Sequence, residues 1–85
     1  MELDCGIARK RITDWLNDEL ALAREGRTWL FAAGVGTCCI TAEKLESRKL
    51  GAVDLERTSV RVEGDELAVE AFMHLFTLRF MSAGG

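Results

Sequence analysis

Apolar residues occupy alternate positions on both sides of the pair Gly64-Asp65. Alternation around a glycine-containing pair of residues is typical of a β-hairpin with a two-residue turn. We therefore predict that residues 59–63 and 66–70 form two paired strands whose apolar side chains share one face of a sheet. These apolar positions are Val60, Val62, Leu67 and Val69.

The second predicted strand continues towards Phe80 and becomes apolar on both faces beyond Phe72. Its second apolar face comprises Phe72, Phe76, Leu78 and Phe80, with His74 among them. If a helix covers one face, another cover is needed for the second, and a second copy of the chain would provide it. The alternative is a helix that begins after Asp65 and has Ala68, Phe72, Phe76 and Phe80 at spacings of four. We favour the strand because the alternation is regular through Val69.

A helical period predicts a helix over residues 4–25, with Asp4 as its N-cap and Gly26 as its C-terminal cap. Its apolar face consists of Cys5, Ala8, Ile12, Trp15, Leu16, Leu20 and Ala23. Glu19 falls in the middle of this apolar face. A buried carboxylate requires a partner, and we predict an ion pair between Glu19 and Arg79. The alternative places Glu19 at the margin of the sheet, where it reaches water.

The middle of the chain reads as a strand over residues 28–33, a turn at Gly34-Val35-Gly36 and a second strand over residues 37–41. Residues 41–51 form a short helix or prolong that strand. The predicted fold is α+β, with an N-terminal helix packed on a mainly antiparallel four-stranded sheet made of two hairpins. Residues 1–85 are expected to form a single domain.

The composition and net charge of the chain argue against some classes of function. The net charge of −3 argues against nucleic-acid binding, which requires basic residues at the phosphates. The longest apolar run, residues 29–40, contains two glycines and is too short to span a membrane. No signal peptide is visible and the three cysteines do not suggest a disulfide framework, so we expect a cytoplasmic protein. Eight arginines against three lysines hint at a bacterial or phage genome.

The sequence contains only weak matches to cofactor-binding, metal-binding and catalytic motifs. The segment Gly34-Val35-Gly36 begins like a dinucleotide-binding loop, but Cys39 stands at the position of the third glycine, so a hairpin turn is the better interpretation. Cys38, Cys39 and His74 form a candidate thiol or metal site, although adjacent cysteines on a strand point to opposite faces. A pocket near Glu19 and His74 is a candidate ligand or catalytic site. We predict no catalytic residue, metal or cofactor.

The favoured function is that of a small self-associating module, expected to be a homodimer, that binds another protein. Its predicted interface comprises Phe72, Phe76, Leu78 and Phe80, because aromatic residues supply large contact areas. Trp29 and Phe31 are possible contributors. The alternative is that the four interface residues complete the core of a monomer.

Overall fold

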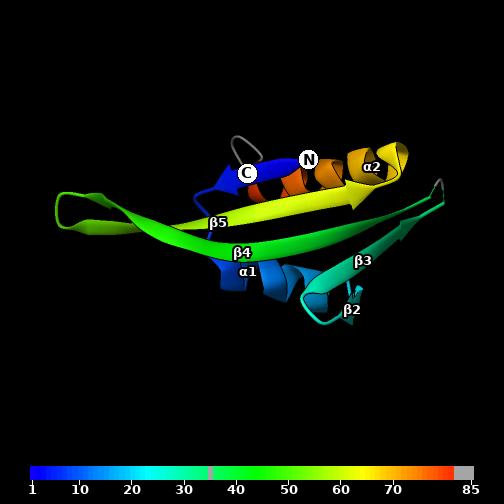
Figure 1. Ribbon diagram of the computed structural model, residues 1–85, viewed down its shortest axis with the longest axis horizontal. Coiled ribbons are helices and arrows are strands. Elements are labelled where there is room, and N and C mark those ends of the chain that lie inside the picture. Colours follow the sequence, from blue (N-terminus) through cyan, green and yellow to red (C-terminus); the bar gives the residue numbers. More distant parts are fainter. Residues whose placement is uncertain (35, 82–85) are drawn as a thin grey trace.

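The computed structural model describes residues 1–34 and 36–81. The elements are β1 (Glu2–Cys5), α1 (Arg9–Asp14), the π-helical segment η1 (Trp15–Glu19), β2 (Ala23–Glu25), β3 (Thr28–Ala33), β4 (Gly36–Leu50), β5 (Val53–Gly64) and α2 (Glu66–Phe80). The strands form one antiparallel sheet in the order β1-β5-β4-β3-β2 (Figure 1). The α+β class is therefore confirmed, with five strands in place of four and with α2 as a second helix.

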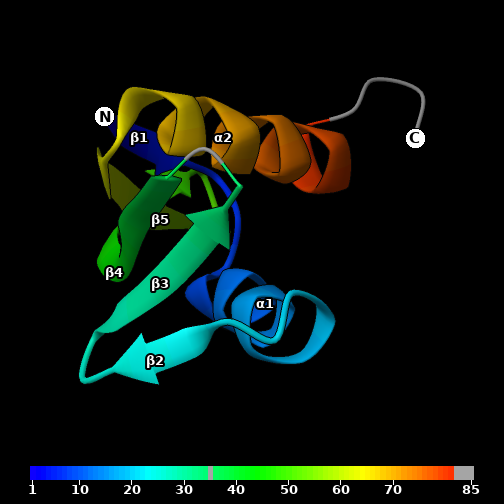
Figure 2. The same cartoon turned by 90° about the vertical axis from the view of Figure 1, so that its right-hand side faces the viewer.

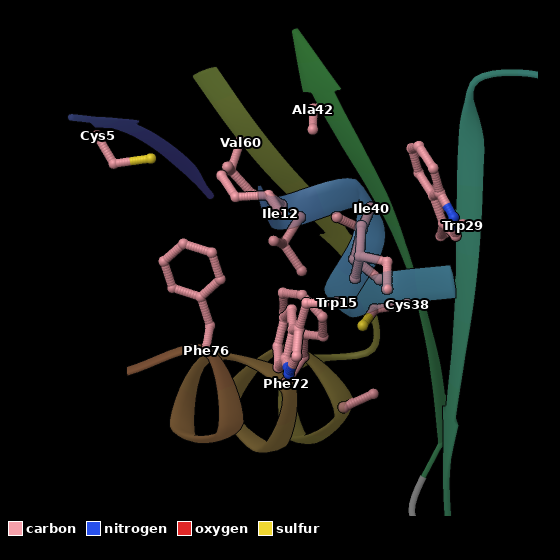
Figure 3. Close-up of a cluster of buried hydrophobic side chains, with 13 residues drawn as sticks. Cys5, Ile12, Trp15, Trp29, Cys38, Ile40, Ala42, Val60, Phe72 and Phe76 are labelled. Carbon is pink, nitrogen blue, oxygen red and sulfur yellow. The ribbon is translucent and has the colours of Figure 1, made fainter. Parts of the chain in front are cut away.

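Both helices pack on the same side of the twisted sheet (Figure 2). Helix α2 covers β3, β4 and β5, and α1 packs against β4. Trp15 joins the two helices, since its ring lies 5.7 Å from that of Phe72 and 5.9 Å from that of Phe76 (Figure 3). The buried apolar core is Cys5, Ile12, Trp15, Leu16, Trp29, Cys38, Ile40, Ala42, Val60, Val62, Ala68, Phe72 and Phe76.

The N-terminal helix is shorter than predicted. Residues 2–5 form β1, which pairs with β5 from Glu2↔Arg61 to Cys5↔Thr58, so Asp4 lies in a strand and is not an N-cap. The helical segments end at residue 19, where the Leu20 N–H donates to the Trp15 carbonyl oxygen at 2.9 Å. The predicted apolar face holds for Ile12, Trp15 and Leu16, which are buried, but its ends are not helical, because Cys5 lies in β1 and Ala23 in β2.

Gly26 has φ of +62°, the left-handed conformation that a helix C-cap would also require. Here it serves the turn between β2 and β3, in which Glu25 pairs with Thr28. The predicted helix C-cap at Gly26 is therefore wrong, because this residue belongs to a two-residue hairpin turn that needs the same left-handed conformation.

The hairpin predicted for residues 28–41 is confirmed, since β3 pairs with β4 from Thr28↔Thr41 to Ala33↔Gly36. Val35, which was assigned to the predicted turn, lies outside the described residues. The alternatives for residues 41–51 resolve in favour of the strand, since β4 runs to Leu50.

The predicted strand over residues 66–80 is wrong, because this segment is helix α2. Strand β5 pairs with β4, with Val60 opposite Ala42 and Val62 opposite Ile40, so residues 66–70 are not its partner. Five alternating residues are too few to distinguish a strand from one turn of helix, and most side chains of α2 are strong helix formers. Asp65 is the N-cap, but its carboxylate accepts a hydrogen bond from the Thr37 N–H at 2.9 Å instead of capping the helix.

Candidate functional surfaces

Helix α2 directs three of the four predicted interface residues towards the protein's own core. Phe72 and Phe76 are completely buried, so they have no surface to offer a partner. Phe80 is partly buried, with its ring 5.3 Å from that of Trp15. Leu78 is 56% exposed. The reason is geometric: a strand would have placed Leu78 on the same face as Phe76 and Phe80, whereas a helix turns it away.

The two aromatic residues suggested as contributors also belong to the covered side of the sheet. Trp29 is fully buried, and its Nε1 donates to Asn17 Oδ1 at 2.7 Å. The Arg24 guanidinium lies 4.6 Å from the centre of the Trp29 ring. Phe31 packs against Phe72 with a ring separation of 5.6 Å. These contacts assign Trp29 to the core and leave Phe31 only partly accessible.

A second apolar surface runs along the outside of α2. Its members recur at spacings of three and four residues, which places them on one side of a helix. This outer stripe consists of Leu67, Ala71, His74, Leu78 and Met81. Leu67 and Leu78 are 57% and 56% exposed, and His74 and Met81 are exposed as well. A helix that is apolar on two opposite sides has buried only one of them here.

Glu19 and Arg79 are brought together, although neither is buried. Arg79 Nε donates to Glu19 Oε2 at 3.1 Å, and both side chains are about half exposed. The prediction that Glu19 is a buried charge is wrong, because η1 ends at this residue and carries its side chain to the edge of the core. An exposed ion pair of this kind contributes little to stability.

Glu19 lines a cavity, but the cavity is not the predicted pocket near both Glu19 and His74. A cavity of ≈ 210 Å³ is lined by Arg11, Asp14, Trp15, Asp18, Glu19 and Arg79. His74 is not among its lining residues, because it faces outward on α2. The structure therefore does not bring Glu19 and His74 into one site.

The candidate thiol or metal residues are also separated. Cys38 is buried beneath the helices and its neighbour Cys39 is exposed on the opposite face of β4, while His74 is exposed on α2. Burial raises the pKa of the Cys38 thiol, and burial likewise raises the pKa of Cys5, so both favour the neutral form. Within residues 1–34 and 36–81, no cluster of three or more histidine, cysteine or acidic side chains is placed to hold a metal.

Strands β4 and β5 continue as a two-stranded arm, residues 43–57, whose tip projects from one end of the molecule (Figure 1). At the base of the arm, Lys44, Glu56 and Arg57 line a cavity together with residues of α1. A register shift between Leu45 and Arg48 bends the ladder within the arm. The register Leu45↔Arg57, Arg48↔Leu55 and Leu50↔Val53 puts these six side chains on one face, which we call the arm face. Leu50, Val53 and Leu55 are 59%, 57% and 41% exposed.

The root of the arm is held by an ion pair. The Arg57 guanidinium donates to both carboxylate oxygens of Asp4 on β1. This hydrogen bond lowers the pKa of Asp4 below its ordinary value and raises that of Arg57. Beside the pair lies a cavity of ≈ 410 Å³ lined by Asp4, Gly6, Arg48, Leu55, Glu56 and Arg57.

Sequence reasoning missed the arm face. The signal that could have found it is the series of apolar positions at Leu45, Leu50, Val53 and Leu55. The shift between Leu45 and Arg48 changes the parity of the positions that share a face, so Leu45 and Leu50 do not look like members of one alternation.

Comparison with protein-family models, with characterised proteins and with solved structures finds no match for this chain. Neither helix in the described part of the chain is long and apolar enough to cross a membrane.

Proposed function

We propose that this domain is a self-associating protein-interaction module in which two copies pack through the outer stripes of α2. The observation that supports this function is that α2 leaves Leu67, Leu78 and Met81 more than half or about half exposed, in line with one another, after its other side has filled the core. Several exposed apolar side chains aligned on one side of an element are typical of protein interfaces.

The stripe is suited to a second copy of itself. His74 lies seven residues from Leu67 and seven from Met81, so an antiparallel alignment about His74 places each Leu67 opposite Met81 of the second copy. Such self-complementarity is what a two-fold interface requires. A parallel alignment would instead bring Glu66 and Glu70 of the two copies side by side, with repulsion between like charges.

The size of the stripe sets the expected strength of the dimer. A helix of 15 residues is about 22 Å long. Stable interfaces bury about 800 Å² on each partner, and one helical seam supplies only part of that area. We therefore expect a dimer that dissociates in the micromolar range, unlike an obligate dimer.

The test is the mass in solution, measured by sedimentation equilibrium up to about 100 μM, a range chosen to bracket the expected dissociation. We expect wild-type protein to dimerise and Leu78→Glu to remain monomeric with an unchanged circular dichroism spectrum. Leu30→Glu is the matched control, because Leu30 is 44% exposed on the opposite side of the sheet. Phe76→Glu is unsuitable, because burying a charge at this core position would unfold the protein.

Two results would contradict self-association through α2: a monomer at every concentration, or a Leu78→Glu variant that dimerises as strongly as the wild type. His74→Leu sharpens the test. It makes the centre of the stripe fully apolar and should tighten the dimer if the two copies meet there.

Neither alternative function is favoured by a specific observation. The thiol or metal proposal would need Cys38, Cys39 and His74 in one site, and the ligand or enzyme proposal would need Glu19 and His74 in one pocket. A cytoplasmic location remains a prediction, supported by three cysteines that are all free thiols.

A further inference from the structure

One edge of the arm, the side of β5 that faces away from β4, has no partner strand in the described part of the chain. We call the space beside this edge the open lane. Strand β1 pairs with β5 only from Arg61 to Thr58, and β5 continues to Val53. Among the described residues, no strand pairs with this side of residues 53–57. A two-stranded ribbon without a further strand or a covering helix is only marginally stable, so this part of the sheet gains from an additional strand.

The direction of the free backbone groups follows from the pairing of the N-terminal residues. Val62 exchanges hydrogen bonds of 2.8 and 2.9 Å with the backbone of Met1, which lies in the same lane as β1. Backbone groups alternate along an antiparallel strand, so the even-numbered residues of β5 point towards this lane. The N–H and C=O groups of Glu56 and Asp54 therefore face the open lane.

A cavity lies at the end of the open lane that is nearest to β1. The cavity of ≈ 410 Å³ lies where β1 ends, between Asp4 and Gly6 on one side and Leu55 to Arg57 on the other. A side chain added at Gly6 would meet nothing within 4 Å. The cavity therefore leaves room beside the base of the arm for one end of an extended segment.

The side chains that border the lane specify the chemistry of such a segment. Leu55 and Val53 lie on the arm face, and Glu56 and Asp54 point to the other face. Lys49 lies opposite Asp54 on β4, and Glu56 lines a cavity with Arg9, Lys10 and Lys44. Within the described residues, however, neither acid has a basic group at ion-pair distance. Apolar side chains on one face and basic side chains on the other would complement this edge, because opposite residues on neighbouring strands interact directly.

We propose that the arm accepts an extended segment of another protein, with alternating apolar and basic residues, as an additional strand beside residues 53–57 of β5. Recognition of this kind combines backbone hydrogen bonds, which provide affinity, with alternate side chains, which provide specificity.

A second copy of the chain is a poorer occupant of the lane. Antiparallel pairing of two β5 edges about Leu55 would place Asp54 of each copy opposite Glu56 of the other, with repulsion between like charges. The proposal therefore concerns a surface and a partner different from those of the α2 stripe, and either proposal can fail without the other.

The probe is a fluorescent peptide of about ten residues, or about five repeats of the alternating pattern, in which valine alternates with lysine. The first control has the same composition in scrambled order. The second has the original order with the amides of alternate residues N-methylated, which removes their hydrogen-bond donors. By fluorescence anisotropy we expect the alternating peptide to bind full-length protein at least tenfold more tightly than either control.

Variants of the protein locate the site. Leu55→Asp and Glu56→Lys should each weaken binding of the valine–lysine peptide at least fivefold. Glu56→Lys should in turn bind better to a peptide in which glutamate replaces lysine, and this exchange of charges holds even if Leu55→Asp fails to fold. Leu30→Asp on the sheet and Leu78→Glu on α2 are controls that should bind the original peptide as the wild type does.

The proposal is overturned if the scrambled or N-methylated peptide binds as well as the alternating one, if no binding is detected at millimolar protein, or if the charge exchange fails. It is also overturned if Leu55→Asp converts a wild-type dimer to a monomer, because the occupant of the arm would then be a second copy of this chain.

Discussion

One pair of strands, β4 and β5, contains both a part of this sheet that is buried on one face and a part that is largely exposed. Where Cys38–Ala42 pairs with Val60–Gly64, the side chains that face the helices are completely or almost completely buried. In the arm, residues 43–57, the same ladder leaves Leu50 and Val53 open to solvent. Backbone pairing is common to both halves, so the helices make the difference. Pairing determines the register of a strand. The helices that pack on it determine how much apolar surface it buries, and therefore how much it contributes to stability.

The largest expected loss of stability comes from removing a side chain of α2 that packs on the sheet. Phe72→Ala deletes a buried ring that contacts Trp15 and Phe31, and should lower the free energy of unfolding by about 3–5 kcal/mol. Denaturant unfolding measures this loss. Hydrogen exchange should show faster opening of the covered half of the ladder, while amides in the arm keep their wild-type rates. A loss below about 1 kcal/mol would mean that α2 is not the main cover of the sheet.

A slightly smaller effect is expected at Gly64, where the covered half meets α2. Its φ is +144°, and an added Cβ would lie 2.6 Å from both the Cys38 Cα and the Thr37 carbonyl oxygen. Because the contacted atoms belong to the backbone, they cannot move aside easily. Gly64→Ala should therefore cost about 2–3 kcal/mol in denaturant unfolding. An unchanged midpoint would show that the junction between β5 and α2 is looser than described.

A matched pair in β5 compares the two halves directly. Val60 is 1% exposed and Val53 is 57% exposed, so the same substitution removes buried methyl groups at one site and solvated ones at the other. Val60→Ala should cost about 2 kcal/mol and Val53→Ala less than about 0.5 kcal/mol. Both values come from urea unfolding. Equal losses would contradict the view that the arm adds little to stability in the absence of a partner.

The smallest effect concerns the root of the arm. The hydrogen bond from Arg57 lowers the pKa of Asp4, so its contribution to stability is present above the ordinary carboxyl range and is lost as the pH falls through the lowered pKa. Asp4→Asn should be slightly less stable than the wild type at neutral pH, and the difference should vanish in acid. Unfolding curves across this pH range test the sign, and a difference that persists in acid would contradict it.

Much of the fold could be predicted from the sequence. The strand at 28–33 and the buried positions Ile12, Trp15 and Leu16 were predicted correctly, because each rests on a clear period. The segment 66–80 was not, since alternation over residues 66–70 fits one turn of a helix as well as a strand. The spacing of four from Ala68 to Phe80 was the longer signal, and tertiary contacts with Trp15 decide the outcome.

The candidate surfaces were predicted less well, and for the same reason. Assigning a strand to residues 66–80 placed Phe72 and Phe76 on an outer face, whereas the helix buries them and leaves Leu78 outside. The idea that this segment is apolar on two sides holds for the helix, with different residues on the second side. Glu19 and Arg79 do meet, but at the surface, because the length of η1 could not be read from the sequence.

The pairing of β1 with β5 has a consequence for synthesis. Residue 2 lies opposite residue 61, so β1 has no partner strand in the sheet until residue 61 has left the ribosome. At about 5–20 residues per second, this delay amounts to several seconds. Helix α2 emerges later still, and until then Trp15 has no phenylalanine rings of α2 to pack against. The core described here is therefore complete only after α2 has been made.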